Sequence, residues 1–307
     1  MELVRSGEVD VASIPVTGLN ETIDGYSKLN LTAGRTQGVS LPYLPDTGET
    51  TSNGNPIGNN VTSDKAIREA LNIGINRSQI VDSVFYGYGD PEYTGFDTKD
   101  YANPQAAVED GDIEGAKNIL EENGWIDSNG DGIREKNGTE ASFKLYYTAE
   151  NVDRQSVAVA FSEQAKELGI DIQLEGTDWD TIYDNMYSSA SYWQSSSINP
   201  YSTVYLQFHS KVANESNYAN PNLYNNSEVD ALLERGLASN SLEESNSYWS
   251  QAALTGDGGG YGPAGDAPWV WLVSFDYVYF VKEGMDINQN RPDNVGNDIL
   301  VNVLDWK

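Results

Sequence analysis

Hydrophobic positions along the chain change their spacing near Thr62, and this change divides the sequence. Before Thr62, short apolar pieces alternate with Gly, Pro, Asn and Thr, which predicts strands near 9–12 and 38–41 and a turn-rich loop at 42–60. After Thr62, apolar residues recur every three or four positions, as they do in amphipathic helices. Helices are predicted at 64–74, 80–84, 113–123, 153–168, 179–187 and 227–238.

Strand patterns flank the longest of these helices. Residues 143–147 and 170–174 read as strands, so together with the helix at 153–168 they predict a βαβ unit. A long aromatic and β-branched stretch at 269–281 predicts a further strand region. This mixture of elements indicates a mixed α/β fold. We expect a compact α/β domain at 62–275, and flanking pieces at 1–61 and 276–307 that pair with each other in a separate lobe.

The charge of the chain excludes several classes of partner. Its 307 residues include 47 acidic and 18 basic side chains, and the formal net charge of −29 repels nucleic acid and anionic lipid. No run of about 20 apolar residues is present to span a membrane. The N-terminus has no apolar signal core. We therefore expect no nucleic-acid partner and no membrane span in this chain.

Cysteine is absent and His209 is the one histidine, which limits the chemistry of the chain. Thiol nucleophiles, Cys-ligated zinc and His-rich metal sites are therefore excluded. A Ser-His-Asp triad would have to use His209, yet no Gly-x-Ser-x-Gly turn presents a serine. We expect no resident cofactor and no catalytic residues.

One loop, Asp127–Gly132, matches the start of an EF-hand calcium loop. Its twelfth position is Gly138, where the motif needs a bidentate Glu, and a strand pattern follows in place of a helix. A calcium site and a metal-free turn rich in Asp and Asn both stay open at this loop. A second acidic pair, Asp178 and Asp180, flanks Trp179, but side chains two positions apart at a helix start diverge. We interpret that pair as a helix cap and a first-turn acid, not as the two acids of a glycosidase.

A candidate ligand-binding segment begins at the aromatic pair Tyr192 and Trp193. Small polar side chains follow, and such a segment presents rings, hydroxyls and amides to a polar ligand. An ordinary flexible loop is the alternative interpretation of the same pattern. The candidate residues in this segment are Tyr192, Trp193, Ser195, Ser196, Ser197 and Asn199.

Six segments, taken in order, resemble the peptide/nickel-binding family of extracellular solute-binding proteins of ABC importers, known as family 5. The second segment is very close to the family pattern D-x-x-V-R-x-A-L-x-x-A-I-D-R, and the six together cover most of the chain. The segments are Gly7–Ala12, Asp64–Arg77, Ala116–Trp125, Asn129–Arg134, Gln164–Asp171 and Asn220–Leu233.

The resemblance implies a periplasmic-binding-protein-like α/β fold of the type II, three-lobed class. Residues 62–275 would form its third lobe, 1–61 would be a remnant of its first lobe with the crossover, and 276–307 would be the C-terminal return to the first lobe. Full-length members carry a signal sequence or lipid anchor and further segments before the Gly7 segment. We therefore expect a C-terminal part of an extracytoplasmic, membrane-anchored protein. It would capture a peptide or a chelated nickel-type ligand between lobes, close around it and dock on ABC permease subunits.

The resemblance also bears on single residues. In dipeptide-binding members the segment after Trp193 reads W-x-x-D-x-x-D-P, and its first Asp pairs with the amino group of the ligand. Ser196 and Asn199 occupy those two positions here, so this loop offers no charge to a cation. Nickel-type relatives hold a metal chelate with Trp, Tyr, Arg and His, which makes His209 a candidate ligand contact. A secreted carbohydrate-active enzyme, and a binding lobe used as a sensor or chaperone, remain the alternatives.

Overall fold

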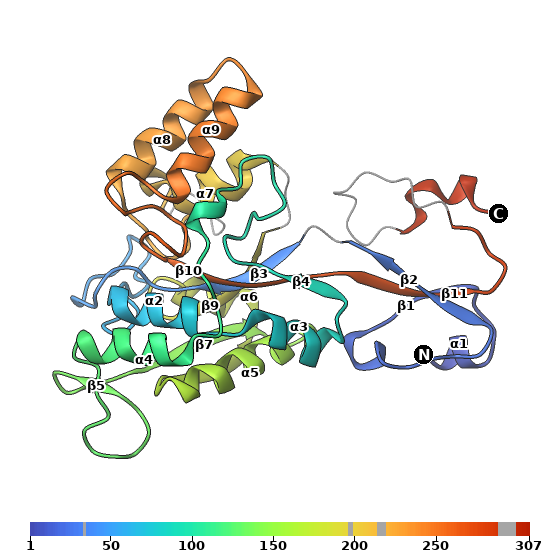
Figure 1. Ribbon diagram of the computed structural model, residues 1–307, viewed down its shortest axis with the longest axis horizontal. Helices are drawn as coiled ribbons and strands as arrows, with labels where there is room; N and C mark the ends of the chain where they lie inside the picture. Colours follow the sequence, from blue (N-terminus) through green and yellow to red (C-terminus); the bar gives the residue numbers. More distant parts are fainter. Residues whose placement is uncertain (33–34, 196–198, 214–218, 288–298) are drawn as a thin grey trace.

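The computed structural model describes residues 1–32, 35–195, 199–213, 219–287 and 299–307. These residues form an elongated molecule in which a large α/β block carries a smaller β-sheet at one end (Figure 1). The block is built on a six-stranded sheet, and the smaller unit is a three-stranded sheet. The strands of the six-stranded sheet, in spatial order, are β4 (Gly89–Pro91), β10 (Trp269–Phe275), β3 (Thr36–Ser40), β9 (Ala190–Ser195), β7 (Ser142–Thr148) and β8 (Asp171–Thr177).

The six-stranded sheet is mixed. Strand β7 runs parallel to both β8 and β9, whereas β3 is antiparallel to β9 and β10, and β10 is antiparallel to β4. The chain leaves β7, forms α5 (Val152–Glu167) and returns in β8, which confirms the βαβ unit predicted from sequence. A separate two-stranded hairpin joins β5 (Glu135–Lys136) to β6 (Thr139–Glu140). Parallel strands in this position bring the carboxyl ends of β7 and β8 to one edge of the block.

One face of the sheet is covered by helices with aliphatic side chains. These are α2 (Lys65–Gly74), α3 (Arg77–Phe85), α4 (Ile113–Glu122) and α5, which lie below the sheet in Figure 1. Helix α2 buries Ile67, Ala70 and Leu71 because these residues recur at helical spacing. Helix α4 ends where Gly124 takes a left-handed φ of 84°, a conformation that glycine adopts without strain.

The opposite face carries an aromatic core. This core includes residues of α6 (Trp179–Asn185), α7 (Leu206–Phe208), α8 (Ser227–Ala238) and α9 (Leu242–Ala253). Of these helices, α7, α8 and α9 lie above the sheet in Figure 1. Trp269 and Trp271 of β10 stack with ring centroids 4.6 Å apart, and Phe208 stacks on Tyr261 at 4.3 Å. Such stacked and edge-on rings stabilise a core through both buried area and ring geometry. Short helical turns complete the chain: α1 (Glu2–Arg5), η1 (Val16–Gly18), η2 (Pro104–Ala106), η3 (Tyr201–Tyr205), η4 (Ser210–Val212) and η5 (Ile299–Asp305).

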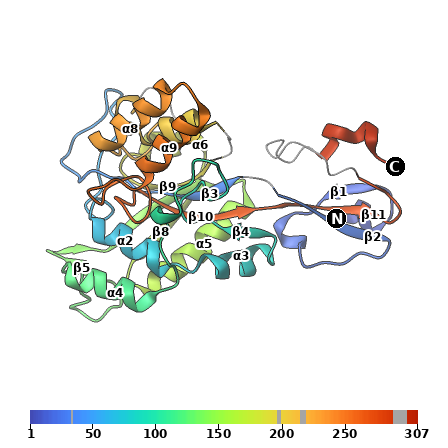
Figure 2. The same cartoon turned by 45° about the horizontal axis from the view of Figure 1, so that its top comes forward.

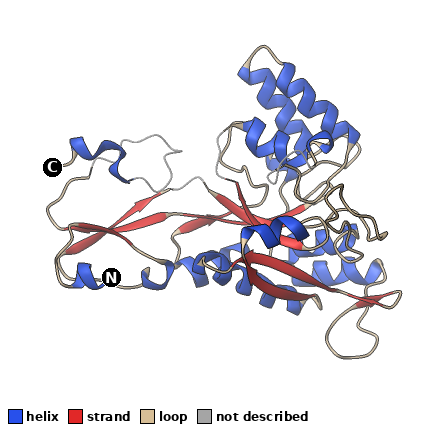
Figure 3. Ribbon diagram, turned by 180° about the vertical axis from the view of Figure 1, so that it is seen from behind, coloured by secondary structure: helices blue, strands red, loops and turns tan. Residues whose placement is uncertain are grey.

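The small sheet joins the two ends of the chain. Strand β11 (Tyr277–Lys282) lies between β1 (Val11–Ser13) and β2 (Tyr26–Leu31), and both pairings are antiparallel. Figure 2 shows this sheet projecting from the α/β block, with both termini beside it. The predicted single strand region at 269–281 is therefore two strands in two different sheets, with Asp276 between them. Figure 3 shows β10 and β11 following one line from the block into the small sheet.

The sequence analysis assigned residues 1–61 to a remnant of the first lobe and the crossover, and the structure places strand β3 of this range in the large sheet. Strand β3 hydrogen-bonds with β9 and β10 inside the large sheet, so this segment is part of the α/β block. The close packing depends on Gly38, because a Cβ added there would lie 2.7 Å from the carbonyl oxygen of Val270 and 2.9 Å from the Cα of Trp271. The position therefore needs a glycine.

The segment Asp64–Arg77, which carries the closest resemblance to the family pattern, holds parts of the α/β block together through the side chains at its two ends. Asp64 caps α2 by accepting a hydrogen bond from the backbone N–H of Ala66 at 3.0 Å. Its other carboxylate oxygen accepts from Trp125 Nε1 at 3.0 Å and from Lys136 Nζ at 2.6 Å. One short acidic side chain thus ties the start of α2 to the chain that follows α4.

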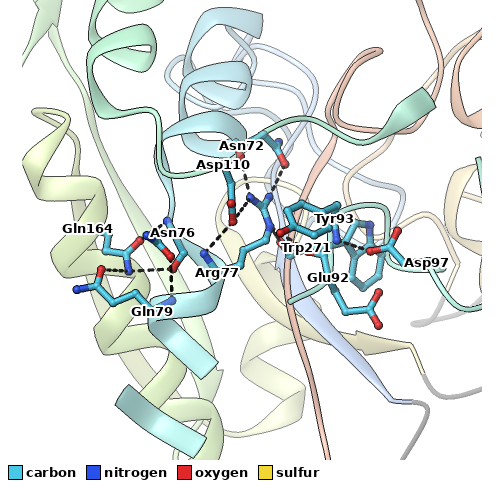
Figure 4. Close-up of polar contacts among 10 residues, drawn as sticks. All are labelled: Asn72, Asn76, Arg77, Gln79, Glu92, Tyr93, Asp97, Asp110, Gln164 and Trp271. Atoms are coloured by element: carbon cyan, nitrogen blue, oxygen red, sulfur yellow. Dashed lines mark hydrogen bonds and ion pairs between the residues drawn. The ribbon is translucent and has the colours of Figure 1, made fainter. Parts of the chain in front are cut away.

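At the other end of this segment, Arg77 is fully buried and fastens four pieces of chain together (Figure 4). Its Nε donates to the carbonyl oxygens of Glu92 at 2.9 Å and Trp271 at 2.7 Å. Its terminal nitrogens donate to the carbonyl and side-chain oxygens of Asn72, and Asp110 lies 3.5 Å away. A buried guanidinium needs this number of acceptors, because each unpaired N–H in the interior is costly.

Candidate functional site

A hollow of about 520 Å³ opens at the carboxyl ends of β7 and β8. Ligands of open α/β sheets bind outside the carboxyl ends of parallel strands, where the loops and the first turns of helices converge. The backbone N–H of Ala149 donates to the carbonyl oxygen of Thr177 at 2.9 Å and holds the two loops together. The hollow is lined by Thr148, Ala149, Glu150, Asn151, Arg154, Thr177, Asp178 and Trp179.

Two capped helices begin at this hollow. Asn151 caps α5 by accepting a hydrogen bond from the backbone N–H of Arg154 at 3.0 Å. Asp178 caps α6 by accepting from the backbone N–H of Thr181 at 2.8 Å, as the sequence predicted. Hydrogen bonds from Thr181 also lower the pKa of the Asp178 carboxyl. Asp178 thus serves as a cap, which agrees with the interpretation of the Asp178 and Asp180 pair given above.

The polar centre of the site is the guanidinium of Arg154, which is 6% exposed. One terminal nitrogen donates to Thr148 Oγ1 at 3.0 Å, and the other donates to Gln194 Oε1 of β9 at 2.9 Å. The guanidinium carbon lies 4.9 Å from the ring centroid of Trp179, a cation–π contact. Burial lowers the pKa of Arg154, and the like charge of Arg35 adds to this effect, but an arginine stays charged at neutral pH.

Aromatic rings form one wall of the site. Trp179 meets Trp193 edge to face with centroids 5.5 Å apart, and it stacks on Tyr183 at the same separation. Tyr183 in turn contacts Trp193 at 6.1 Å. Flat rings of this kind contact apolar parts of a ligand and hold it with little loss of conformational entropy. Trp193 is therefore the sequence-predicted residue that lies directly behind the wall of the hollow.

The structure separates the other residues predicted in this segment. Tyr192 is fully buried in the aliphatic core beneath helices α2 to α5, and its hydroxyl donates to Gln37 Oε1. Burial raises the pKa of that hydroxyl. Ser195 ends β9 and is buried opposite Thr36 of β3. Asn199 is exposed, and its Oδ1 accepts from the backbone N–H of Tyr201 at 3.0 Å. Ser196 and Ser197 lie outside the described residues.

His209 lies away from the lining of the hollow and is fully buried. Its Nδ1 accepts a hydrogen bond from the backbone N–H of Lys211 at 3.1 Å, which caps a short 3-10 turn. Its Nε2 lies 3.4 Å from Glu234 Oε1, and its ring packs at 4.5 Å on Tyr205. These contacts give the side chain a packing and capping role within the aromatic core. Its predicted role in ligand contact stays a prediction.

The sequence analysis did not single out Thr148 or Arg154, and it considered Trp179 only together with its acidic neighbours. The pairing of Arg154 with Gln194 joins positions 40 residues apart, so no local pattern reveals it. One signal was available in the sequence. An arginine in the first turn of α5 is unfavourable to the helix dipole, and such a position invites a search for a functional reason.

The loop Asp127–Gly132 is a turn held by its own side chains. Asp127 accepts from the backbone N–H groups of Gly130 at 2.7 Å and Gly132 at 3.0 Å. Asp131 accepts from Ile133 N–H at 2.8 Å. A hollow of about 280 Å³ beside the loop is lined by the cationic side chains of Lys117, Arg134 and Lys166 as well as by acids. In the part of the chain that the structure describes, no three His, Cys, Asp or Glu side chains gather as a metal site.

Three features together are those of the class of periplasmic binding proteins. They are a mixed sheet with helices on both faces, a hollow at the carboxyl ends of its parallel strands, and a second sheet that follows directly from the first. Solved structures share this fold. AppA from Bacillus subtilis, in complex with a nonapeptide, has a TM-score of 0.74 at 21% identity and matches 99% of this chain and 57% of that chain. NikZ from Campylobacter jejuni, in complex with Ni(L-His), has a TM-score of 0.75 at 17% identity and matches 100% of this chain and 59% of that chain.

Sequence comparison then gives the family. Residues 1–215 match the bacterial extracellular solute-binding proteins, family 5 (Middle), and the chain belongs to this family, which confirms the resemblance drawn from its motifs. Protein XP55 of Streptomyces lividans is 29% identical over 291 residues, which are 92% of this chain and 48% of that protein. Oligopeptide-binding protein AppA of Bacillus subtilis is 30% identical over 187 residues, 57% of this chain and 33% of that protein. The chain spans about half the length of XP55 and a third of the length of AppA.

The family consists of binding proteins, and the fold confirms the predicted mixed α/β, periplasmic-binding-protein-like class. Among the described residues, no helix is both long enough and apolar enough to cross a membrane.

Proposed function

We propose that this chain is part of the substrate-binding subunit of an ABC importer, which captures an oligopeptide or a chelated nickel-type ligand. The observation that carries this proposal is the hollow at the carboxyl ends of β7 and β8, where a buried arginine and an aromatic wall face one space. Polar groups that converge in a largely aromatic pocket are the general character of small-ligand sites. Related proteins of the family are named for peptide and nickel binding, which agrees with this chemistry.

The proposed ligand contacts follow from the site. We propose that Trp179 forms the wall against which the ligand lies and that Trp193 supports this wall from behind. We also propose that Ser195, Ser196, Ser197 and Asn199 contribute ligand contacts. Tyr192, which is fully buried, would act from beneath this surface, whereas the equally buried His209 would serve the packing of the aromatic core. In this arrangement Tyr192 holds β9 against β3 through Gln37, and so positions Trp193.

We further propose that the hollow is one half of an interlobe cleft. Residues 62–275, together with β3, would form the ligand-binding third lobe, and the small sheet with residues 276–307 would belong to the first lobe. A ligand favours the closed arrangement only if it contacts both lobes, because only then does its affinity differ between open and closed forms. The full-length protein would be extracytoplasmic and membrane-anchored, and its closed form would dock on the permease subunits.

Binding without catalysis is part of the proposal. Hydrolysis of a glycoside needs two carboxylates on opposite sides of one bond, one of them with a raised pKa. The two acids that line the hollow, Glu150 and Asp178, are exposed, and Asp178 is committed to capping α6. Of the charged groups that line the hollow, the buried one is the cation Arg154. This arrangement suits recognition of an anionic or polar ligand.

The test is a thermal-shift titration of the chain with trialanine, nickel–histidine and maltose. A ligand that binds the native state raises the unfolding midpoint, and at 100 times its dissociation constant it stabilises by about 2.7 kcal/mol. We expect trialanine or nickel–histidine to raise the midpoint and maltose to leave it unchanged. Trp179→Ala should abolish the shift, whereas Leu242→Ala, at an 81% exposed position on α9, should retain it. A shift with maltose alone, or with none of the three, would refute the proposal.

A further inference from the structure

A second hollow, of about 140 Å³, lies where the small sheet meets the α/β block. It shares no lining residue with the hollow at the carboxyl ends of β7 and β8. Strands β1 and β11 contribute to its lining from the small sheet, and α3, α5 and β10 contribute from the block. We call it the seam hollow, and its lining includes Ile14, Phe85, Asp153, Phe275, Asp276 and Tyr277.

Two carboxyl groups line the seam hollow, and no Lys or Arg of the described chain lines it with them. Asp153 belongs to α5, and Asp276 separates β10 from β11. Burial raises the pKa of both carboxyls, and the like charge of Asp90 adds to this effect at Asp276. Oδ2 of Asp276 accepts from Asn30 Nδ2 at 2.7 Å, whereas its buried Oδ1 has no hydrogen-bond partner among the described residues. A buried charge without a counter-charge is costly, so this pair attracts a cation from outside.

Aromatic rings stand beside the two carboxyl groups. Phe85 of α3 and Phe275 of β10 line the seam hollow and stack with ring centroids 5.3 Å apart. The ring of Tyr277 already has a cation beside it, because the guanidinium carbon of Arg35 lies 5.6 Å from its centroid. The faces of aromatic rings attract cations, most strongly where water is excluded. Phe85 and Phe275 are therefore the rings available to a cation in the hollow.

The rest of the lining limits which kind of cation fits. It is largely aliphatic, with Ile14, Val16 and Leu19 among its side chains. Ca²⁺ and Mg²⁺ take about six or more oxygen ligands, including bound waters, and an aliphatic wall does not satisfy them. An alkyl ammonium ion instead presents its alkyl groups to such a wall and its charge to the acids. At about 30 Å³ for each water-sized group, the hollow has room for about five non-hydrogen atoms.

We propose that the seam hollow binds a small organic ammonium ion, with Asp153 and Asp276 as its counter-charges and Phe85 and Phe275 as its aromatic wall. The bound ion would contact the small sheet and the α/β block together, because both contribute to the lining. This site is separate from the one in the proposed function, so either proposal can stand without the other.

The experiment compares probes of one shape that differ in charge. These are tert-butylammonium, a cation at neutral pH, and tert-butanol, which is neutral; tetramethylammonium adds a cation without an N–H donor. Binding to the whole chain is measured by saturation-transfer NMR on the methyl protons and by thermal shift, in excess NaCl at constant ionic strength. Ionic hydrogen bonds and cation–π contacts should give tert-butylammonium about a ten-fold higher affinity than tert-butanol. Binding in excess Na⁺ also shows that the site prefers an organic ion to a metal ion.

Three variants and a control assign the effect to the seam hollow. Asp276→Asn and Asp153→Asn each remove one charge and should reduce the preference for tert-butylammonium to less than about three-fold. Phe275→Leu removes a ring and should weaken tetramethylammonium more than tert-butanol. The control Asp82→Asn makes the same change in net charge at an exposed position on α3 and should leave all three affinities unchanged. Circular dichroism checks that each variant is folded.

The outcomes decide the inference in both directions. A preference for the ammonium ions that both Asp variants reduce supports it. Equal affinity for tert-butylammonium and tert-butanol overturns it, as does the lack of binding of either ion. A preference that persists in both Asp variants also overturns it, because the ions then bind elsewhere on this acidic chain. If Asp276→Asn does not fold, Asp153→Asn, on the other side of the hollow, decides the question.

Discussion

Glu92 offers the sharpest test of the energetics of this fold. The residue follows β4, its side chain is 3% exposed, and its Oε2 has no hydrogen-bond partner among the described residues. Figure 4 shows it beside Asp97, whose carboxylate accepts from the backbone N–H groups of Tyr93 and Thr94. Burial, followed by the charge of Asp97, raises the pKa of Glu92 from 4.5 to about 8. The folded protein therefore holds Glu92 protonated at neutral pH.

The sign of the effect follows from proton linkage. The unfolded chain releases the proton of Glu92 near pH 4.5, whereas the folded chain keeps it up to about pH 8. The contribution of Glu92 to stability is therefore complete below pH 4.5 and is lost as the pH rises through 8. One unit of pKa difference corresponds to about 1.4 kcal/mol, so retaining the proton at pH 7 costs about 3 kcal/mol. Between pH 5 and pH 8 this cost grows by about 3 kcal/mol.

Glu92→Gln replaces the acid by a neutral side chain of the same shape and removes this cost. We expect the variant to exceed the wild type in free energy of unfolding by about 3 kcal/mol at pH 7, and the advantage to shrink towards pH 5. Urea unfolding followed by tryptophan fluorescence at pH 5, 6, 7 and 8, at constant ionic strength, measures it. Glu122→Gln, at an exposed position at the end of α4, is the control with no pH-dependent gain. A Glu92→Gln difference that is constant over this range would refute the reasoning.

Three further substitutions test contacts that hold the fold. Gly38→Ala places a Cβ against β10 and should lower the free energy of unfolding by about 2 kcal/mol in urea titrations. The control is Gly256→Ala, where an added Cβ meets nothing within 4 Å, and it should change this free energy little. Asp64→Ala removes a helix cap and leaves Trp125 Nε1 without its acceptor. Thermal unfolding should therefore show a free energy of unfolding lower by about 2 kcal/mol. An unchanged midpoint would contradict the role given to this carboxylate. His209→Ala opens a void beneath Tyr205, so it should lower the free energy of unfolding by about 2 kcal/mol and leave the affinity for nickel–histidine unchanged. A selective loss of that affinity would instead favour the ligand role predicted from sequence.

Much of the α/β block could be predicted from the sequence because its signals are local. Asp64 and Asp178 cap helices as predicted, and Gly169 ends α5 with a φ of 83°. Strand β2 was not predicted, since its sequence YSKLNL is half polar and its pairing with β11 spans about 250 residues. Helix α9 was not predicted either, because Ser, Asn and Glu fill its first turns and its apolar face appears only against α8.

The candidate site was harder to predict than the fold. Trp193 was proposed because aromatic residues next to hydroxyls are visible in one stretch of sequence. The role of Arg154 depends on the lack of a carboxylate partner among the described residues. It depends also on Gln194, which lies in a strand that the sequence analysis interpreted as the start of a loop. His209 was chosen for its residue type, and only the packing shows how deeply it is buried. Absence of a partner and depth of burial are properties of the folded chain, so no sequence pattern records them.

The alignment of β10 with β11 sets how the two sheets could move. A single residue, Asp276, separates these strands, and the one other passage between the sheets is the short stretch from β2 to β3. Because the chain passes from β10 to β11 through this one residue, a swing of the small sheet would pivot about the seam at Asp276. The buried side chains at this seam form one cluster with the α/β block, because Ile14, Leu19 and Phe280 belong to the same hydrophobic core as Phe85 of α3. A ligand that turns the small sheet about that seam would therefore also have to rearrange this shared packing.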